Sequence, residues 1–521
     1  MSTKVEKVVE FEIHRFDPET KRRYVSTYKV PIRKGMTILD ALMYIRDNLD
    51  GTLAFRSSCR MGICGSCGVL VNGKPMLACY TQVLHLNADK LVVEPLQNFP
   101  VIKDLVVDIQ PFFGTFDRIK NVLVKPEEEL KKPAEFIQLP VDLKKIWDLA
   151  LCTKCGICYS SCPAAIDERF LGPSTLATNY RFIIDTRDEG RDERLKTAAD
   201  NIWLCTSCNS CTLFCPKEVD SSSSIVEERS LLVEGGDIPR TVMDVLTSVM
   251  RYHNPMGRYP TKRIEWTNGL DIKIYPDVTK ADVLYFVCCL TAYDTRHQKI
   301  ARALADILNR LGVDFATLGN EEWCCGDHIL RLGEKGLFEE LAEHNLSMFK
   351  KFEANKIVTL SPHCYNTFKN DKPYADENLN VQHYTQFLAE AIERGRLKPL
   401  KHLQKRVAYH DPCFLGKRNQ IFEEPRKILE SINGIELIEM KRNRENSFCC
   451  GGGAGRVWTE DAPPEKRPCV ERVKEALEIG AEIIATACPF CVSTLEDATK
   501  VLDAEDKIIV KDIAELIREL L

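Results

Sequence analysis

The distribution of cysteine constrains this chain more than any other feature of its sequence. The 521 residues include 23 cysteines, none lies before Cys59, and Cys469 alone stands apart from a recognisable group. The N-terminal stretch MSTKVEKVVEFEIHRFD has no apolar signal core, and no apolar run approaches the roughly 18 residues that span a bilayer. We therefore expect a cytoplasmic protein whose clustered cysteines bind metals or act in catalysis rather than form disulfides.

Length and charge narrow the possibilities further. A chain of 521 residues has room for three or four domains. The formal net charge of -5 gives no basic surface for nucleic acid.

The first cysteine group has the spacing C-x4-C-x2-C followed by a distant cysteine. This is the plant-type pattern for a [2Fe–2S] cluster, whereas zinc sites rarely use it. Glycines inside the group let backbone N–H groups approach the sulfurs. Alternating patterns predict strands over 8–16, 22–32 and 68–77 and a helix over 37–49, with a hairpin turn at Asn72-Gly73. The predicted ligands are Cys59, Cys64, Cys67 and Cys79.

The second and third groups, CTKCGICYSSCP and CTSCNSCTLFCP, both have the spacing C-x2-C-x2-C-x3-C-P. In two-cluster ferredoxins the fourth cysteine of each run binds the other cluster. We therefore expect two [4Fe–4S] clusters in a domain whose intervening sequence is helical in composition. One cluster would be held by Cys152, Cys155, Cys158 and Cys215, and the other by Cys205, Cys208, Cys211 and Cys162.

Residues from about 7 to 250 resemble the iron–sulfur subunits of succinate dehydrogenases and fumarate reductases. The stretch RSSCRMGICGSCGVLVNGKPMLAC is similar to that family's signature. The family's common respiratory members lack a cysteine at the position of Cys208 and hold a [3Fe–4S] cluster there. The presence of Cys208 predicts a [4Fe–4S] cluster instead.

The cysteines from Cys288 onward fall into two copies of one pattern, as expected for a duplicated domain. Each copy alternates strand-like and helix-like segments, which predicts α/β units with a parallel core. The cysteines follow the strand-like runs, so we expect them at the carboxyl ends of the strands, where open α/β sheets bind ligands. The stretch RYHNPMGRYPTKRIEW, 251–266, is expected to link this half to the first.

Copy two has the full pattern and resembles the cysteine-rich CCG domain of heterodisulfide reductases. That family carries a noncubane [4Fe–4S] cluster that binds and cleaves a disulfide. Zinc is the alternative that the spacing leaves open. By motif position the resemblance implies five ligands with a catalytic role, namely Cys413, Cys449, Cys450, Cys488 and Cys491.

Copy one departs from this pattern because Ser361 stands where a cysteine is expected. Its hydroxyl does not ionise near neutral pH and is a poor ligand, but Cys288 is an extra neighbour that would compensate. A noncubane cluster, a conventional cluster, a structural zinc ion or no metal all remain open. The predicted metal ligands are Cys289, Cys324, Cys325 and Cys364.

Other residues are less informative. Cys469 is expected to be a free thiol. His363 and His410 adjoin predicted ligands and would either supply protons, hydrogen-bond with the ligands or pack in the core. We find no dinucleotide fingerprint, so a flavin would have to sit on another chain.

Nearly the whole chain resembles the iron–sulfur subunits of the thiol:fumarate reductases of methane-producing archaea, in which the two halves are fused. The resemblance implies four domains: a β-grasp plant-type ferredoxin domain over 1–110, an α-helical two-cluster ferredoxin domain over 111–255, and CCG domains over 275–398 and 399–521. It also implies oxidation of the coenzyme M and coenzyme B thiols to their heterodisulfide, with electrons passing to an FAD-containing flavoprotein that reduces fumarate to succinate.

Two alternatives remain at this stage. One is the iron–sulfur subunit of a quinone-linked succinate dehydrogenase or fumarate reductase, with the second half as a membrane-side module. The other is a passive electron-transfer subunit with structural zinc in both copies.

Overall fold

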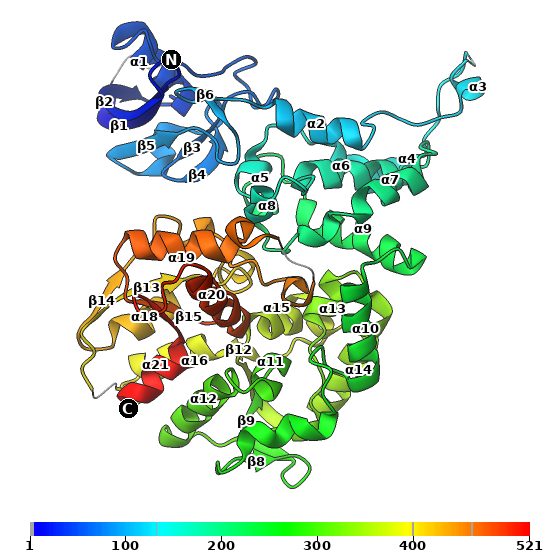
Figure 1. Cartoon of the computed structure of the whole chain (residues 1–521), viewed down its shortest axis with the longest axis vertical. Coiled ribbons are helices and arrows are strands. Elements are labelled where there is room, and N and C mark those ends of the chain that lie inside the picture. Colours follow the sequence, from blue (N-terminus) through cyan, green and yellow to red (C-terminus); the bar gives the residue numbers. More distant parts are fainter. Residues whose placement is uncertain (1–4, 132, 399–400, 460–461) are drawn as a thin grey trace. The chain divides into compact units, whose positions relative to one another are not determined.

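The computed structural model describes residues 5–131, 133–398, 401–459 and 462–521 (Figure 1). These residues form two compact units, which we describe separately. Unit 1 is Met1–Ile202 with Asn209–Glu228, and unit 2 is Trp203–Cys208 with Arg229–Leu521. The short segment 203–208, which carries Cys205 and Cys208, therefore belongs to unit 2 although the residues on both sides of it belong to unit 1. The division into four domains stays a prediction, and its boundary at 398/399 meets residues 399–400, which lie outside the described residues.

Unit 1 begins with a mixed five-stranded sheet in the order β2-β1-β5-β3-β4. Its inward side chains alternate along β1 and pack against α1, as the alternating sequence predicts. A capping box between Thr37 and Asp40 starts α1. Asn72 and Gly73 both have positive φ in the β3–β4 hairpin, which confirms the predicted turn. The elements are β1 (Val5–Asp17), β2 (Arg22–Arg33), α1 (Ile38–Asn48), β3 (Gly68–Val71), β4 (Lys74–Leu77) and β5 (Lys90–Glu94).

The rest of unit 1 is mainly helical, in agreement with the predicted composition. A two-stranded ribbon, β6 (Val101–Lys103) and β7 (Val106–Val107), precedes the helices. The helices are α2 (Gln110–Arg118), α3 (Glu127–Leu130), α4 (Pro140–Ala150), α5 (Ile157–Ser160), α6 (Pro173–Ile183), α7 (Arg191–Ala199), α8 (Ser210–Leu213) and the first part of α9 (Ser221–Gly235).

Unit 2 contains two parallel sheets with the same connectivity, which supports the predicted duplication. Copy one has the order β12-β11-β9-β10-β8, and copy two has the order β14-β13-β15-β16. The central strand is β9 in copy one and β13 in copy two. The next strand along the chain, β10 or β14, lies on one side of it. The two strands after that, β11 and β12 or β15 and β16, lie on the other side. The strands are β8 (Lys273–Ile274), β9 (Lys280–Phe286), β10 (Phe315–Thr317), β11 (Glu353–Thr359), β12 (Val381–His383), β13 (Lys405–His410), β14 (Ile435–Ile438), β15 (Ile483–Thr486) and β16 (Ile509–Asp512).

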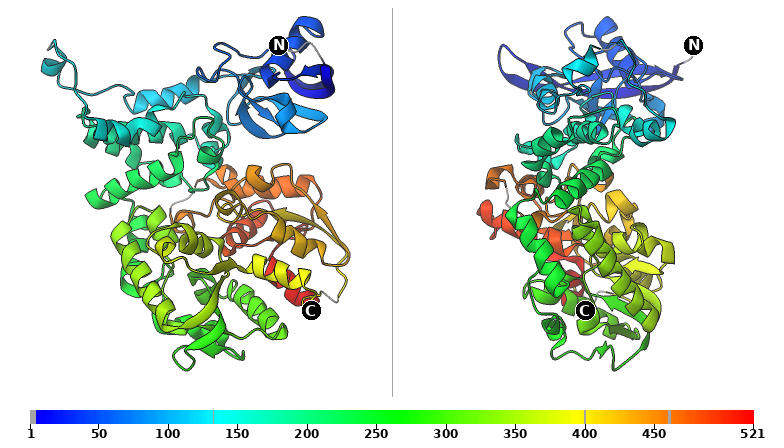
Figure 2. Two further views of the ribbon diagram at one scale, coloured as in Figure 1. Left: turned by 180° about the vertical axis from the view of Figure 1, so that it is seen from behind. Right: turned by 90° about the vertical axis from the view of Figure 1, so that its right-hand side faces the viewer.

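Helices surround both sheets and join the two copies. The C-terminal helix of copy two, α21, packs beside α12 of copy one (Figures 1 and 2). The helices of copy one are α11 (Cys289–Tyr293), α12 (Gln298–Arg310), α13 (Asp327–Arg331), α14 (Lys335–Lys351), α15 (Pro362–Asn370) and α16 (Tyr384–Glu393). Those of copy two are α17 (Gly416–Asn419), α18 (Glu423–Glu430), α19 (Pro468–Glu478), α20 (Pro489–Val501) and α21 (Ile513–Leu520).

The stretch 251–266, expected as a link, is packed within unit 2. It follows α10 (Arg240–Tyr252), which buries Val242, Val245 and Val249 on its apolar face. Asn254 is fully buried and Trp266 is 1% exposed, because a turn and a 3-10 helix fold this stretch onto copy one.

Candidate metal centres

The first cysteine group lies in an exposed loop of unit 1 that is rich in sulfur-directed N–H groups. The N–H of Gly62 donates to Cys79 Sγ (3.2 Å), and those of Ile63 and Cys64 donate to Cys59 Sγ (3.3 and 3.2 Å). Several hydrogen bonds lower the pKa of the Cys64 thiol to about 6, and the bond with Ser66 contributes most. Such donors stabilise the negative charge of thiolates that hold a metal.

Gly65 brings this loop against the second cysteine group. It has a φ of +73°, and a side chain there would meet Cys155 Cα at 2.7 Å. The close approach of the two loops therefore requires a residue without a Cβ atom. This close approach places the predicted [2Fe–2S] loop directly beside Cys155, a predicted [4Fe–4S] ligand, within unit 1.

The structure brings together the four cysteines predicted for one [4Fe–4S] cluster. They line one small cavity, although one of them comes from the other run. Burial raises the pKa of Cys155 to about 11, with smaller contributions from the charges of Cys152 and Cys215. The four residues are Cys152, Cys155, Cys158 and Cys215.

The other predicted [4Fe–4S] set is divided between the units. Cys205 and Cys208 belong to unit 2, whereas Cys162 and Cys211 belong to unit 1. All four are buried. That these four cysteines bind one [4Fe–4S] cluster stays a prediction.

Copy one brings five thiols together rather than four. Hydrogen-bonding contacts between side chains connect Cys289 to Cys324, Cys324 to Cys325, Cys325 to Cys364, and Cys364 to Cys288. All five lie beyond the carboxyl ends of the parallel strands, where the sequence predicted them. Copy one therefore offers as many sulfur donors as copy two.

Ser361 has a structural role in copy one. Its hydroxyl accepts a hydrogen bond from the N–H of His363 (3.3 Å) and caps α15. Cys288 contributes the fifth thiol in its place. Arg263, which no sequence signal singled out, donates to Cys289 Sγ (3.3 Å) and pairs with the buried carboxylate of Glu322.

Copy two brings together all five of its predicted ligands. Cys413 Sγ lies 3.9 Å from Cys449 Sγ, and Cys450 Sγ lies 3.3 Å from Cys491 Sγ. Cys488 hydrogen-bonds with Cys491 at the start of α20. The adjacent pair thus has one thiol, that of Cys449, beside Cys413 and the other, that of Cys450, beside Cys491. Two neighbouring thiols can therefore join these two parts of one ligand set.

Hydrogen bonds favour the thiolate form of three copy-two cysteines, namely Cys449, Cys450 and Cys488. Burial raises the pKa of Cys488, but hydrogen bonds from Cys491 and His363 outweigh it and lower that pKa to about 5. Hydrogen bonds from Cys449 and Cys491 hold the pKa of Cys450 well below its ordinary value. Thiolates are the form of cysteine that binds metals, so the donor set suits an iron–sulfur cluster.

Two histidines that adjoin predicted ligands contact the copy-two cysteines. His363 lies 2.7 Å from Asp327 through its Nδ1 and also hydrogen-bonds with Cys488. Burial lowers the pKa of His363, but the charge of Asp327 outweighs it and raises that pKa to about 10. A histidine of copy one therefore donates to a predicted ligand of copy two.

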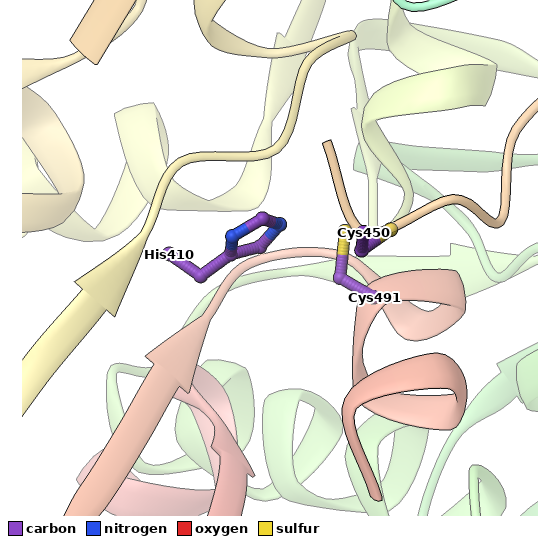
Figure 3. Close-up of side chains that lie close together, drawn as sticks. All are labelled: His410, Cys450 and Cys491. Carbon is purple, nitrogen blue, oxygen red and sulfur yellow. Dashed lines mark hydrogen bonds between the residues drawn. The ribbon is translucent and has the colours of Figure 1, made fainter. Parts of the chain in front are cut away.

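His410 ends β13 beside Cys450 and Cys491, with one ligand atom of each residue within 4.8 Å of the others (Figure 3). Its Nδ1 accepts a hydrogen bond from Arg472 (3.0 Å), so Nε2 carries the hydrogen. Burial and the charge of Arg472 lower the pKa of His410 to about 3. His410 is thus a neutral ring beside the thiols, and its Nδ1 lone pair is already used by Arg472 rather than free for a metal.

The segment 203–208 packs against copy two inside unit 2. Cys208 forms one buried cluster with Cys413, Phe414 and Cys449, and its side chain hydrogen-bonds with that of Cys449. Arg418 holds the segment by donating to the carbonyl of Ser207 (2.8 Å). A predicted [4Fe–4S] ligand therefore touches two predicted ligands of the copy-two centre.

Within the described residues, every helix is too short or too polar to cross a lipid bilayer.

Known protein families match the chain in all four regions. Residues 10–114 match the 2Fe-2S iron-sulfur cluster binding domain, and residues 148–219 match the 4Fe-4S dicluster domain. Residues 283–369 and 407–496 each match the cysteine-rich CCG domain.

Whole proteins match as well. An uncharacterised iron–sulfur protein of Methanocaldococcus jannaschii is 33% identical over 96% of both chains. A subunit of the CoM/CoB fumarate reductase of Methanothermobacter marburgensis is 30% identical over 94% of this chain and 95% of its own. A subunit of the dihydromethanophenazine:CoB–CoM heterodisulfide reductase of Methanosarcina barkeri is 32% identical over 72% of this chain and 95% of its own.

The matched domains and the cysteine groups define the class of protein: this chain is an iron–sulfur oxidoreductase subunit. More closely, it belongs to the family of multidomain iron–sulfur proteins that includes the matching subunit of the CoM/CoB fumarate reductase.

Proposed function

We propose that this chain is the iron–sulfur subunit of a thiol:fumarate reductase. Coenzyme M and coenzyme B each lose the hydrogen of their thiol, and one S–S bond forms between them. The two electrons and two protons reduce fumarate to succinate, so the reaction balances without another oxidant. Thiol oxidation takes place at copy two, and fumarate reduction takes place on a flavoprotein partner.

The arrangement of copy two carries this proposal. Five buried thiols from separate segments converge, and those of Cys450 and Cys488 favour the thiolate form. A noncubane [4Fe–4S] cluster bound by these residues would supply iron for a substrate sulfur and accept single electrons. His363 hydrogen-bonds with Cys488 and orients that thiol, and the neutral ring of His410 lies beside Cys450 and Cys491.

Two close contacts support electron transfer away from copy two. In unit 2, Cys208 touches Cys413 and Cys449, so ligands of two predicted clusters meet. In unit 1, Gly65 brings the predicted [2Fe–2S] loop against Cys155. Electrons would leave through the two [4Fe–4S] clusters and then the [2Fe–2S] cluster.

The loop of the first cysteine group offers a surface for the flavoprotein. Met61 and Ile63 are 67% and 58% exposed in the loop that carries the exposed residue Cys64, and Tyr80, 67% exposed, lies against Gly62 of the same loop. Large apolar side chains that gather on a surface mark sites of protein association. We assign this surface to an FAD-containing fumarate reductase subunit, the flavoprotein of the proposed complex.

We also propose that copy one binds an iron–sulfur cluster with Cys288 as its fifth ligand. The five thiols form a continuous chain of contacts, and Arg263 donates to one of them. A structural zinc ion needs four ligands in a tetrahedral site and gives no reason for a fifth thiol.

The test uses the chain purified without oxygen, oxidised, and mixed with coenzyme M or coenzyme B separately. We expect a thiol-dependent EPR signal that is absent from Cys450→Ser and is not produced by S-methyl-coenzyme M, which has no S–H bond. The complex with the flavoprotein should then reduce fumarate with both thiols. No signal with either thiol, together with fumarate reduction from a quinol, would contradict the proposal.

Neither alternative is favoured over this function. The relative that matches 94% of the chain is named for coenzyme M and coenzyme B rather than for a quinone. A passive subunit with zinc in both copies would give about two zinc ions per chain and no thiol-dependent signal.

A further inference from the structure

The stretch 251–266, which the sequence indicated as a link, reaches two predicted ligands of copy one. The carbonyl of His253 accepts the backbone N–H of Cys324 (3.0 Å). Arg263, on the 3-10 helix of this stretch, donates through Nη1 to Cys289 Sγ (3.3 Å). The same 3-10 helix packs against α11, which begins at Cys289. The stretch is therefore part of the surroundings of the copy-one centre.

Arg263 is one half of a buried ion pair. Its other terminal nitrogen, Nη2, donates to the carboxylate of Glu322. The two residues are 2% and 3% exposed. The ring of Tyr293 lies against the guanidinium, with its centroid 5.6 Å from Cζ. Because a guanidinium stays charged at physiological pH, Arg263 places a permanent positive charge on Cys289 and holds the negative charge of Glu322 on its other side.

The carboxylate of Glu322 also holds the backbone that carries Cys288. Its Oε2 accepts the N–H of Val287 (3.2 Å), and the carboxylate accepts the N–H of Cys288 as well. The hydroxyl of Thr291 lies within hydrogen-bond distance of the carbonyl oxygens of the same two residues. Cys288 has a positive φ, which residues other than glycine rarely adopt. Glu322 and Thr291 therefore fix the backbone that brings the fifth thiol to Cys364.

The copy-one centre is shielded from solvent. The residues that carry its five thiols are between 1% and 5% exposed. Charges in such surroundings are weakly screened, so a fixed charge beside a ligand changes the energy of an added electron more than it would at the surface.

The ion pair distinguishes copy one from copy two. Glu322 stands two residues before the adjacent cysteines of copy one, and Ser447 stands two residues before those of copy two. The hydroxyl of Ser447 donates to the carbonyl of Asp411 (3.1 Å). The corresponding position of copy two therefore holds its loop through a neutral hydrogen bond rather than through a charge.

We propose that Arg263 and Glu322 are positioning residues of the copy-one centre and that their charges shift its reduction potential in opposite directions. Arg263 favours the state that holds one more electron, because a cation on Cys289 offsets the added negative charge. Glu322 disfavours that state, while its contacts with the backbone keep Cys288 in the ligand set. The assignment rests on the proposed iron–sulfur cluster of copy one, whereas the ion pair and its contacts are independent of it.

The test is a redox titration of the anaerobic full-length chain, followed by EPR. The copy-one signal is the one that Cys288→Ser removes. In Arg263→Gln the equilibrium constant for adding one electron should fall at least about 10-fold, which lowers the midpoint potential by about 59 mV or more. In Glu322→Gln, which keeps an oxygen for the backbone N–H groups, the midpoint should rise. General damage to the site would not shift the two midpoints in opposite directions.

Matched variants separate the charge from its surroundings. Arg263→Lys keeps a positive charge and should shift the midpoint less than Arg263→Gln does. Arg426→Gln removes a buried arginine of copy two that is held by two carboxylates, and it should leave the copy-one midpoint unchanged. If Arg263→Gln loses iron because Glu322 is left unpaired, Arg263→Gln combined with Glu322→Gln replaces it. That double variant should still lower the midpoint, because Arg263 contacts Cys289 Sγ directly.

The outcomes distinguish this proposal from the proposed function. A copy-one midpoint in Arg263→Gln at or above that of the natural chain, with the iron retained, would overturn the role of Arg263 and leave the copy-one cluster intact. A lower midpoint in Glu322→Gln would overturn the opposed effect of the pair. If Cys288→Ser removes neither an EPR signal nor iron, the proposed copy-one cluster and this proposal both fail.

Discussion

At the scale of single residues, Cys288 is the least expected part of the site. It has φ +74° and ψ +147°, a backbone conformation that non-glycine residues rarely adopt. Such a conformation costs on the order of 1–3 kcal/mol and persists where the surroundings enforce it. Here it brings the Cys288 thiol to Cys364, at the point where Ser361 has taken a capping role.

We predict that Cys288→Ser lowers the iron content by about four atoms per chain, because copy one then lacks its fifth thiolate. The measurement is iron per chain in anaerobic protein, with the EPR spectrum of the reduced protein. Ser361→Ala is the matched control: it should keep the iron and cost about 1 kcal/mol of stability through the lost helix cap. Equal iron in Cys288→Ser and the natural chain would contradict a cluster held by this residue.

Single residues also show what the sequence could not predict. The two C-x2-C-x2-C-x3-C-P runs indicated the set that includes Cys215, and the resemblance to the CCG domain indicated the set in copy two. Arg263 and Asp327 could not be predicted, because each meets its site through tertiary contacts. His363 was recognised beside Cys364, yet its partner Cys488 belongs to the other copy.

At the scale of elements, alternation and composition predicted the strands of unit 1 and the α/β character of unit 2. They did not predict that segment 203–208 belongs to unit 2. That placement depends on bare backbone in the glycine run after Cys450. A Cβ atom on Gly453 would lie 2.5 Å from the carbonyl oxygen of Thr206. The glycine therefore allows Cys208 to reach Cys449.

We predict that Gly453→Ala pushes this segment away and destabilises the chain by about 1–3 kcal/mol, the usual effect of overpacking. Gly452→Ala is the matched control, since its Cβ would meet Thr494 Cγ2 at 3.1 Å, an end of a side chain that can move. Urea midpoints of the anaerobic proteins provide the comparison. A midpoint for Gly453→Ala at or above that of Gly452→Ala would contradict the steric account.

At the scale of the whole molecule, neighbouring cysteine groups come into contact within each unit. In unit 1 the loop of the first group lies against Cys155, and in unit 2 Cys208 contacts Cys449. The cysteines of copy two are buried, whereas the first cysteine group is partly exposed. In the proposed function, electrons that leave the chain would therefore do so at the first group. Met61, Ile63 and Tyr80 are exposed apolar side chains at or near this first group.

We predict that Ile63→Glu weakens binding of the flavoprotein at least about 10-fold, or about 1.4 kcal/mol, because it puts a charge into the apolar contact. Binding is measured by calorimetry, and the EPR spectrum of the [2Fe–2S] cluster should not change, since Ile63 contributes its backbone N–H to Cys59. Val8→Glu, at a residue of β1 that is 56% exposed, is the control and should bind normally. Equal affinities for Ile63→Glu and Val8→Glu would place the flavoprotein elsewhere on the chain.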